Sequence, residues 1–292
     1  MCGVSAARGP TRGQVRRRRR VAAGVLALVA AALVYIALEA TVFAPVDTHG
    51  AELDHLTIDS KAVGKDLGVN VIVPPRAGPK GDRWLLVYLH GRGGYEGTFN
   101  DAVLRGLPSL RGKQPVVAFP DGGDHGYWHD RAEGDWGTYV MKEMIPTVVK
   151  RFGIDPKRLA IGGISMGGFG AYDIALQNPG RFCAVGGHSP ALWFEGAETA
   201  PGAFDDLADF ERNDVVATVQ EDPDAFGHTR VWNDYGQTDD FKVYDEGFVA
   251  AMEAGDADFT THSWPGGHEG GYWDAHWPDY QRFYANSLKD CH

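Results

Sequence analysis

The sequence predicts an α/β fold built on a mostly parallel, doubly wound sheet. Short apolar runs that suit buried strands alternate with segments of helical periodicity along most of the chain. One run, at residues 84–89, reads WLLVYL without polar alternation, which is typical of a strand buried on both faces. A glycine-rich turn at residues 162–168 joins a strand to a helix, and the residue at its apex would project from the sheet edge.

The N-terminus has the pattern of a targeting segment. Five arginines at residues 16–20 precede an uncharged apolar stretch at residues 21–38. We expect a basic cytoplasmic arm at residues 1–20 and a signal anchor at residues 21–40, because this stretch reaches the length of a membrane span. Cleavage as a signal peptide is the alternative, although Pro45 would hinder a peptidase. Residues 41–292 then form one extracytoplasmic domain, either membrane-anchored or secreted.

Charge argues against nucleic acid as a partner. The net charge is −11, and residues 1–40 contain seven of the 28 basic side chains but only one of the 39 acidic ones. The remaining domain is therefore strongly acidic and repels nucleic acid and anionic lipid surfaces. A basic arm that binds nucleic acid is disfavoured because the apolar stretch follows it directly. The substrate is expected to be neutral or to meet a local positive charge.

Two cysteines, Cys183 and Cys291, lie in the part of the chain expected outside the cytoplasm. In an oxidising compartment they could form a disulfide that ties the C-terminal tail to the domain. The alternative is a buried Cys183 thiol beside a frayed tail, since the sequence does not supply the Cα separation that a bridge requires.

A second glycine-rich turn follows the run at residues 84–89. His90 is expected to pack beneath this turn, whose glycines at residues 91, 93 and 94 let the backbone curl around an anion. We assign the backbone N–H of Arg92 to an oxyanion hole, with a plain strand-to-helix loop as the alternative. The other strands expected in this half of the chain are residues 53–58, 69–74 and 116–119.

The loop after residue 119 is rich in aromatic and histidine side chains. Tyr127 and Trp128 are expected to form one wall of a substrate cleft, with core packing as the alternative. His125 and His129 could bind a metal with nearby acids, but no H-E-x-x-H helix supports this and we expect none. We also expect no cofactor. An amphipathic helix follows at residues 139–152.

Ser165 stands at the apex of the turn GGISMGG, between a strand at residues 158–162 and a helix at residues 169–177. Gly163 and Gly167 lack a Cβ, so the strand and the helix can approach closely around a strained serine. We predict that Ser165 is a nucleophile and that the N–H of Met166 is the second oxyanion donor. An ordinary exposed serine is the alternative, because the G-x-S-x-G pattern alone is weak evidence.

The alternation of strands and helices is interrupted at residues 189–228, a polar and acidic stretch that we expect to form a small lid-like insertion over the site. Trp193 and Phe194 at its start are candidates for the cleft, with packing in an exposed lid as the alternative. The expected elements of this half are strands 182–186, 229–232 and 260–264 and helices 204–216, 242–254 and 277–288.

A nucleophilic serine needs a base, and the base needs an acidic partner. Ser165, Asp239 and His268 follow predicted strands in the order typical of a doubly wound hydrolase. Asp239 is favoured by its place after the Gly236 turn, and His268 by its place in a glycine-rich loop. The competing residues are Asp234 and Asp240 for the acid and His262 and His276 for the base.

Together, GGISMGGFGAY, HGRGG, GQTDDF and PGGHEGGYW resemble the putative-esterase family of α/β-hydrolases over residues 53–288. This family includes esterase D (S-formylglutathione hydrolase), feruloyl esterases and the mycolyltransferases of mycobacterial envelopes. The resemblance implies an α/β-hydrolase fold and supports Ser165, Asp239 and His268 as the triad, with Arg92 and Met166 as oxyanion donors. The basic and apolar N-terminus departs from the cytosolic S-formylglutathione hydrolases, and Arg92 is a departure at the oxyanion turn.

These observations predict a serine carboxylesterase that forms an acyl-enzyme on Ser165. One alternative is an acyltransferase, similar to the mycolyltransferases, that moves an acyl group to a sugar or another alcohol. A catalytically inactive binding protein of the cell envelope is an alternative of another class. Aromatic residues near the expected cleft, Trp273 among them, suit small-molecule, lipid or sugar esters.

Overall fold

The computed structural model describes residues 29–31, 34 and 47–291. The predicted cytoplasmic arm and most of the predicted anchor lie outside these residues. Among the described residues, no helix combines the length and the apolar character needed to cross a bilayer. The α/β domain begins at Asp47.

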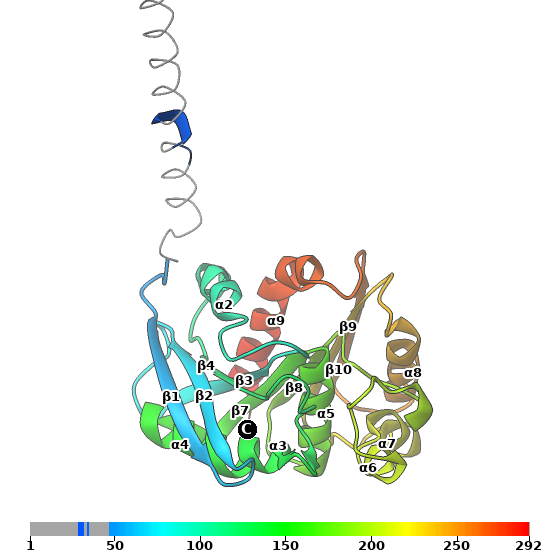
Figure 1. Ribbon diagram of the computed structural model, residues 1–292. Coiled ribbons are helices and arrows are strands. Elements are labelled where there is room, and N and C mark those ends of the chain that lie inside the picture. Colours follow the sequence, from blue (N-terminus) through cyan, green and yellow to red (C-terminus); the bar gives the residue numbers. More distant parts are fainter. Residues whose placement is uncertain (1–28, 32–33, 35–46, 292) are drawn as a thin grey trace, which may run out of the picture. The chain divides into compact units, whose positions relative to one another are not determined.

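An eight-stranded sheet forms the centre of the domain (Figure 1). The strands lie in the order β1-β2-β4-β3-β7-β8-β9-β10. The pairs β1–β2 and β2–β4 are antiparallel, whereas all other neighbours are parallel, which confirms the predicted mostly parallel sheet. The strands are β1 Glu52–Ser60, β2 Lys65–Val73, β3 Arg83–Leu89, β4 Val116–Pro120, β7 Ile154–Ile164, β8 Ala184–His188, β9 Arg230–Gly236 and β10 Phe259–Trp264.

Helices cover both faces of this sheet (Figure 1). Alternate residues of β3 enter different cores: Leu85 and Val87 join the core beneath α4, α5, α7 and α8, whereas Leu86 and Tyr88 join the core beneath α2 and α9. This two-sided burial explains why β3 shows no polar alternation. The helices are α2 Asn100–Gly106, α3 Trp136–Thr138, α4 Ile145–Phe152, α5 Met166–Gln177, α6 Leu207–Arg212, α7 Val215–Glu221, α8 Lys242–Met252 and α9 Gly270–Asp290.

Shorter elements complete the domain and refine two of the predictions. The helix expected at residues 139–152 begins as a π-helical turn, η2 Tyr139–Met144, before α4. The single helix expected at residues 204–216 is two helices, α6 and α7, because Asp206 and Asp214 each cap a new N-terminus. The remaining elements are 3₁₀ turns η1 Leu107–Ser109 and η3 Gly196–Glu198 and a hairpin of β5 Asp130–Arg131 and β6 Gly134–Asp135.

Cys183 and Cys291 form a disulfide, with their Cα atoms 5.5 Å apart. The bridge joins the residue before β8 to the residue after α9, across a sequence separation of 108. The alternative of a free Cys183 thiol is therefore wrong. Because α9 ends at this bridge, the disulfide fastens the last helix to the sheet that it covers.

Candidate active site

Ser165 occupies the turn between β7 and α5, as the glycine pattern predicts. Its φ of 55° lies in the left-handed region, which is strained for a residue with a side chain. A Cβ on Gly163 would lie 2.4 Å from the Gly167 backbone, and a Cβ on Gly167 would lie 2.1 Å from the Leu89 carbonyl oxygen. Only glycine permits this close approach. The turn is also held by a hydrogen bond from the Ser165 N–H to the His188 carbonyl at 3.1 Å.

The structure brings the three predicted triad residues together at the C-terminal ends of the parallel strands. His268 Nε2 lies 2.8 Å from Ser165 Oγ, and His268 Nδ1 lies 3.1 Å from both carboxylate oxygens of Asp239. A neutral imidazole with its proton on Nδ1 satisfies both contacts, since it donates to Asp239 and accepts the Ser165 hydroxyl proton. The His268 side chain is 23% exposed and the Asp239 side chain 0% exposed, so the base is accessible while its partner is shielded.

The environment of Asp239 keeps its carboxyl group ionised. Burial favours the neutral acid, but hydrogen bonds from His268 and from the Phe241 N–H outweigh burial and hold the pKa of Asp239 below its usual value. The ionised carboxylate can therefore stabilise an imidazolium on His268.

The competing residues have other partners. Asp234 is fully buried, with its carboxylate 2.6 Å from His188 Nδ1, and Asp240 is exposed. His262 and His276 each stack on the Trp264 ring, at centroid distances of 4.5 and 3.9 Å. None of these four side chains has a hydrogen bond to Ser165 in the part of the chain that the structure describes.

The turn after β3 passes directly beside the nucleophile. A Cβ on Gly91 would lie 3.4 Å from Ser165 Cβ, and Arg92 follows it in the cavity wall. Neither the Arg92 N–H nor the Met166 N–H donates to an acceptor within the described residues. Met166 opens α5, where the first amides have no partner inside the helix. Arg92 thus lines the cavity and Met166 directly follows Ser165, and their role as oxyanion donors stays a prediction.

His90 supports this turn from below, as expected. Its ring is buried, donates from Nδ1 to the Gly91 carbonyl at 2.8 Å, and accepts the Gly122 N–H on Nε2 at 2.9 Å. Burial lowers the pKa of His90, so the ring stays neutral and accepts that hydrogen bond.

A cavity of about 700 Å³ opens in front of Ser165 and His268. Apolar and aromatic side chains dominate its walls, as in most small-molecule sites. Two of the predicted cleft residues, Tyr127 and Trp273, line this cavity. Sequence reasoning missed several further lining residues, namely Tyr95, Thr98, Phe99, Ile164, Ala200, Phe241, Asp274 and Trp277. The spacing of Trp273 and Trp277 on one face of α9 is a signal that could have found one of them.

The other two predicted cleft residues are corrections. Trp128 is fully buried, donates from its indole to the His90 carbonyl, and fills a slot that the absence of a Cβ on Gly170 leaves open. Trp193 is also buried and packs edge to face against Phe241 behind the cavity wall. Both indoles therefore belong to the core, which was the alternative for Trp128.

The insertion contributes less to the site than a lid would. Of residues 189–228, only Ala200 lines the cavity, and helix α7 packs against α5 and α8.

The histidines considered for a metal have separate partners: His129 Nε2 lies 3.1 Å from Asp209 Oδ2, whereas His125 lies beside Asp124 and Glu133. The described residues contain no cluster of three or more His, Cys, Asp or Glu side chains suited to a metal ion.

Comparisons with known proteins agree with this geometry. A family model described as "Putative esterase" matches residues 60–284. An esterase of Mycobacterium tuberculosis is 29% identical over 138 residues, which cover 44% of this chain and 30% of that protein. S-formylglutathione hydrolase of Bos taurus is 35% identical over 88 residues, which cover 28% of this chain and 30% of the relative. The matched part is thus under a third of either relative's length.

Solved structures share the fold over most of their length. A ferulic acid esterase superposes with a TM-score of 0.71 at 19% identity, covering 81% of this chain and 98% of the other. An S-formylglutathione hydrolase from Agrobacterium tumefaciens gives 0.66 at 22% identity, with coverages of 82% and 96%. MPT51 of Mycobacterium tuberculosis gives 0.63 at 18% identity, with coverages of 82% and 99%. These likenesses establish an α/β-hydrolase-like fold.

Proposed function

Because this chain belongs to the family described as putative esterases, we propose that it is a serine carboxylesterase that forms an acyl-enzyme on Ser165. The supporting observation is the continuous line of contacts from the Ser165 hydroxyl through His268 to Asp239, at the wall of an apolar cavity. Each of these groups already has the partner that ester hydrolysis requires of it.

The reaction follows from these contacts. His268 Nε2 takes the hydroxyl proton as Ser165 Oγ attacks the ester carbonyl carbon, and the carbonyl oxygen becomes an oxyanion. The N–H groups of Arg92 and Met166 donate to this oxygen, and each such donor lowers the barrier by roughly 3 kcal/mol. The tetrahedral adduct then collapses, and His268 returns its proton to the leaving alcohol.

Water completes the cycle. His268 removes a proton from a water molecule, whose oxygen attacks the acyl-enzyme carbonyl. The second adduct releases the carboxylic acid, and the proton on His268 returns to Ser165 Oγ. Asp239 stays ionised throughout and stabilises the imidazolium that forms twice in each turnover.

Hydrolysis of 4-nitrophenyl esters of graded acyl length tests this proposal. Wild type should cleave these esters, whereas Ser165→Ala should lose activity by at least about 10⁴-fold. A fluorophosphonate should label wild type on Ser165 and leave the variant unlabelled. Ser263→Ala, which changes an exposed serine on β10, is the matched control and should retain both properties. An unlabelled wild type without esterase activity would instead support an inactive binding protein.

Acyl transfer to an alcohol is the second candidate. The aromatic walls formed by Tyr95, Trp273 and Trp277 favour it, because a cavity that holds an alcohol close to the acyl-enzyme lets that alcohol compete with water. Product analysis with and without an added sugar or glycerol distinguishes the two reactions. A new ester that grows with acceptor concentration indicates transfer, and free acid alone indicates hydrolysis.

We also propose that the catalytic domain lies on the extracytoplasmic side of a membrane. The basic residues 16–20 followed by the apolar residues 21–38 support this orientation, and the Cys183–Cys291 disulfide suits an oxidising compartment. Protease treatment of intact cells that express the full chain should digest the domain. A domain that is degraded only after lysis would contradict the proposal.

A further inference from the structure

The side chain of Arg92 brings a positive charge to an otherwise largely apolar cavity. Arg92 lines the cavity wall and is exposed, and no acidic side chain of the described residues lies within 4.0 Å of its guanidinium. The acid that lines the cavity, Asp274, lies 3.5 Å from Arg105. Arg92 is thus a cation without an ion-pair partner among the described residues, and it lines the same cavity as Ser165. Its side chain lies within hydrogen-bonding reach of the Tyr127 hydroxyl.

Tyr127 lies beside Arg92 and is held in an unusual backbone conformation. Its φ is 50° and that of Trp128 is 63°, so two consecutive residues with side chains lie in the left-handed region. Such a conformation is unfavourable for a residue with a side chain and persists only where the surroundings enforce it. Backbone strain of this kind is typical of residues at functional sites.

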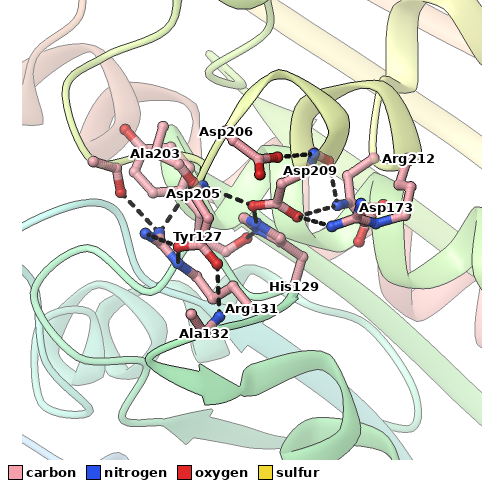
Figure 2. A network of polar contacts seen from close by, with 12 residues as sticks. Tyr127, His129, Arg131, Ala132, Asp173, Ala203, Asp205, Asp206, Asp209 and Arg212 are labelled. Carbon is pink, nitrogen blue, oxygen red and sulfur yellow. Dashed lines mark hydrogen bonds and ion pairs between the residues drawn. The ribbon is translucent and has the colours of Figure 1, made fainter.

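Three sets of contacts enforce the conformation of this loop, and Figure 2 shows the two that involve His129 and Arg131. The Trp128 indole donates to the His90 carbonyl. The buried His129 ring lies 3.1 Å from Asp209 of the insertion. Arg131, whose side chain is 4% exposed, donates to Asp205 at 3.0 Å and to the carbonyls of Gly202 and Ala203 at 2.8 and 3.1 Å. The insertion therefore clamps the loop and fixes Tyr127 in the cavity wall.

The Tyr127 hydroxyl is a neutral donor at this position. Burial raises its pKa, and the nearby Arg92 guanidinium opposes that rise without cancelling it. A guanidinium and a phenol side by side can donate to the oxygens of one carboxylate. Elsewhere the acidic domain repels anions, so this corner would be the part of the site that attracts one.

We propose that Arg92 and Tyr127 form a subsite for a carboxylate group of the substrate, close to the scissile ester. The inference rests on the proposed esterase activity and narrows its substrate class to esters that bear a nearby anionic group. The backbone N–H of Arg92 would donate to the oxyanion, and its guanidinium would bind the carboxylate of the same substrate. One residue would thus contribute both to the reaction and to substrate specificity.

Two pairs of esters test the proposal. Mono-4-nitrophenyl succinate and 4-nitrophenyl butyrate differ by a carboxylate on the acyl side, and 4-acetoxybenzoate and its methyl ester differ by one on the alcohol side. The measured quantity is the ratio of kcat/KM for the anionic to the neutral ester, so intrinsic reactivity cancels between enzymes. Arg92→Gln should lower this ratio about tenfold in at least one pair, the scale of a charge-assisted hydrogen bond, and Arg92→Lys should retain part of it.

Matched measurements separate charge recognition from other effects. Arg111→Gln removes the same charge from an exposed arginine that does not line the cavity and should change the ratio less than twofold. Tyr127→Phe should lower it about threefold, and added salt should lower it in wild type. A fall of less than fivefold in Arg92→Gln for both pairs, or an equal fall in Arg111→Gln, would overturn the subsite. Failure of wild type to hydrolyse the neutral esters would instead refute the esterase proposal.

Discussion

Two imidazole–carboxylate pairs lie near one another: His188 and Asp234 on strands β8 and β9, and Asp239 and His268 in the loops that follow β9 and β10. His268 Nδ1 lies 3.1 Å from Asp239, and His188 Nδ1 lies 2.6 Å from Asp234. Each imidazole also lies within 3 Å of a hydroxyl oxygen, which belongs to Ser165 in the first pair and to a buried tyrosine in the second. The molecule therefore contains two copies of the same contact chain, in which a hydroxyl contacts an imidazole and the imidazole contacts a carboxylate.

The second arrangement is closed on every side. Both His188 and Asp234 are 0% exposed, and His188 Nε2 lies 2.9 Å from the Tyr284 hydroxyl. Burial holds the pKa of Tyr284 well above its usual value, so this hydroxyl remains protonated. The Asp234 carboxylate receives further hydrogen bonds at 2.7–2.9 Å from Trp232, Tyr272 and Tyr280.

From this contrast we propose that access to the cavity, and not the geometry of the pair, separates the catalytic pair from the structural one. His188 is one of four hydrogen-bonding partners of the buried Asp234 side chain. Two of the others, Tyr272 and Tyr280, belong to α9 and fasten this helix to the sheet. Asp239 has fewer donors, and its histidine faces a cavity. The first pair should thus control the reaction rate, and the second should control stability.

The largest effect is expected when the accessible histidine is removed. His268→Ala should lower kcat/KM for a nitrophenyl ester about 10⁴- to 10⁶-fold, roughly 5.5–8 kcal/mol of barrier, because Ser165 loses its base. Thermal unfolding should change little, since the ring is partly exposed. His262→Ala on β10 is the matched control and should keep its activity. Retained activity in His268→Ala would remove the distinction between the two pairs.

The buried pair should show the opposite response. Asp234→Asn replaces the acceptor of four hydrogen bonds, so buried donors lose their partner and the free energy of unfolding should fall by about 3–5 kcal/mol. Urea unfolding measures this loss. At a temperature where the variant is folded, kcat should stay within about tenfold of wild type. A stable but inactive Asp234→Asn protein would assign the buried pair a catalytic role.

Removal of the disulfide should destabilise the attachment of α9 to the sheet less than Asp234→Asn does. Cys291→Ser should lower the free energy of unfolding by about 2–4 kcal/mol, because the unfolded chain regains the freedom of a long closed loop. Folded enzyme should keep its esterase activity, since the bridge lies at the end of α9 remote in sequence from Trp273. Reductant should destabilise wild type and leave Cys291→Ser unchanged. Equal stability of the two oxidised proteins would contradict the role assigned to the bridge.

Much of the fold and the candidate triad could be predicted, because local patterns encode them. Strands buried on both faces must be apolar, and a strained serine turn needs glycines at both sides, so β3 and the Ser165 turn leave clear signals. The order of Ser165, Asp239 and His268 follows from the way parallel strands deliver their C-terminal loops to one edge. The helix α2 was missed because Phe99 at its N-cap offers no capping side chain.

Features that depend on distant packing could not be predicted. The sequence around Trp128 does not indicate that its indole packs against Gly170 of α5, where the missing Cβ leaves room for the ring. Trp128 was therefore expected in the cleft but is buried in the core. The pairing of Cys183 with Cys291 depends on a Cα separation that only the folded sheet defines. His188 was overlooked because its partner, Asp234, comes from the next strand of the sheet.

The smallest effect is expected from the pH dependence of Asp239. Its folded pKa lies below the ordinary value of 3.8, so the unfolded chain binds the proton more tightly. The carboxylate thus adds stability that is fully present above about pH 4 and is lost as pH falls through the folded pKa. The site is partly open to solvent, so the contribution should stay below about 1 kcal/mol. Comparing the unfolding of wild type and Asp239→Asn between pH 2 and pH 6 tests this. The gap between the proteins should narrow as pH falls, and a gap that widens would show that Asp239 is not held ionised.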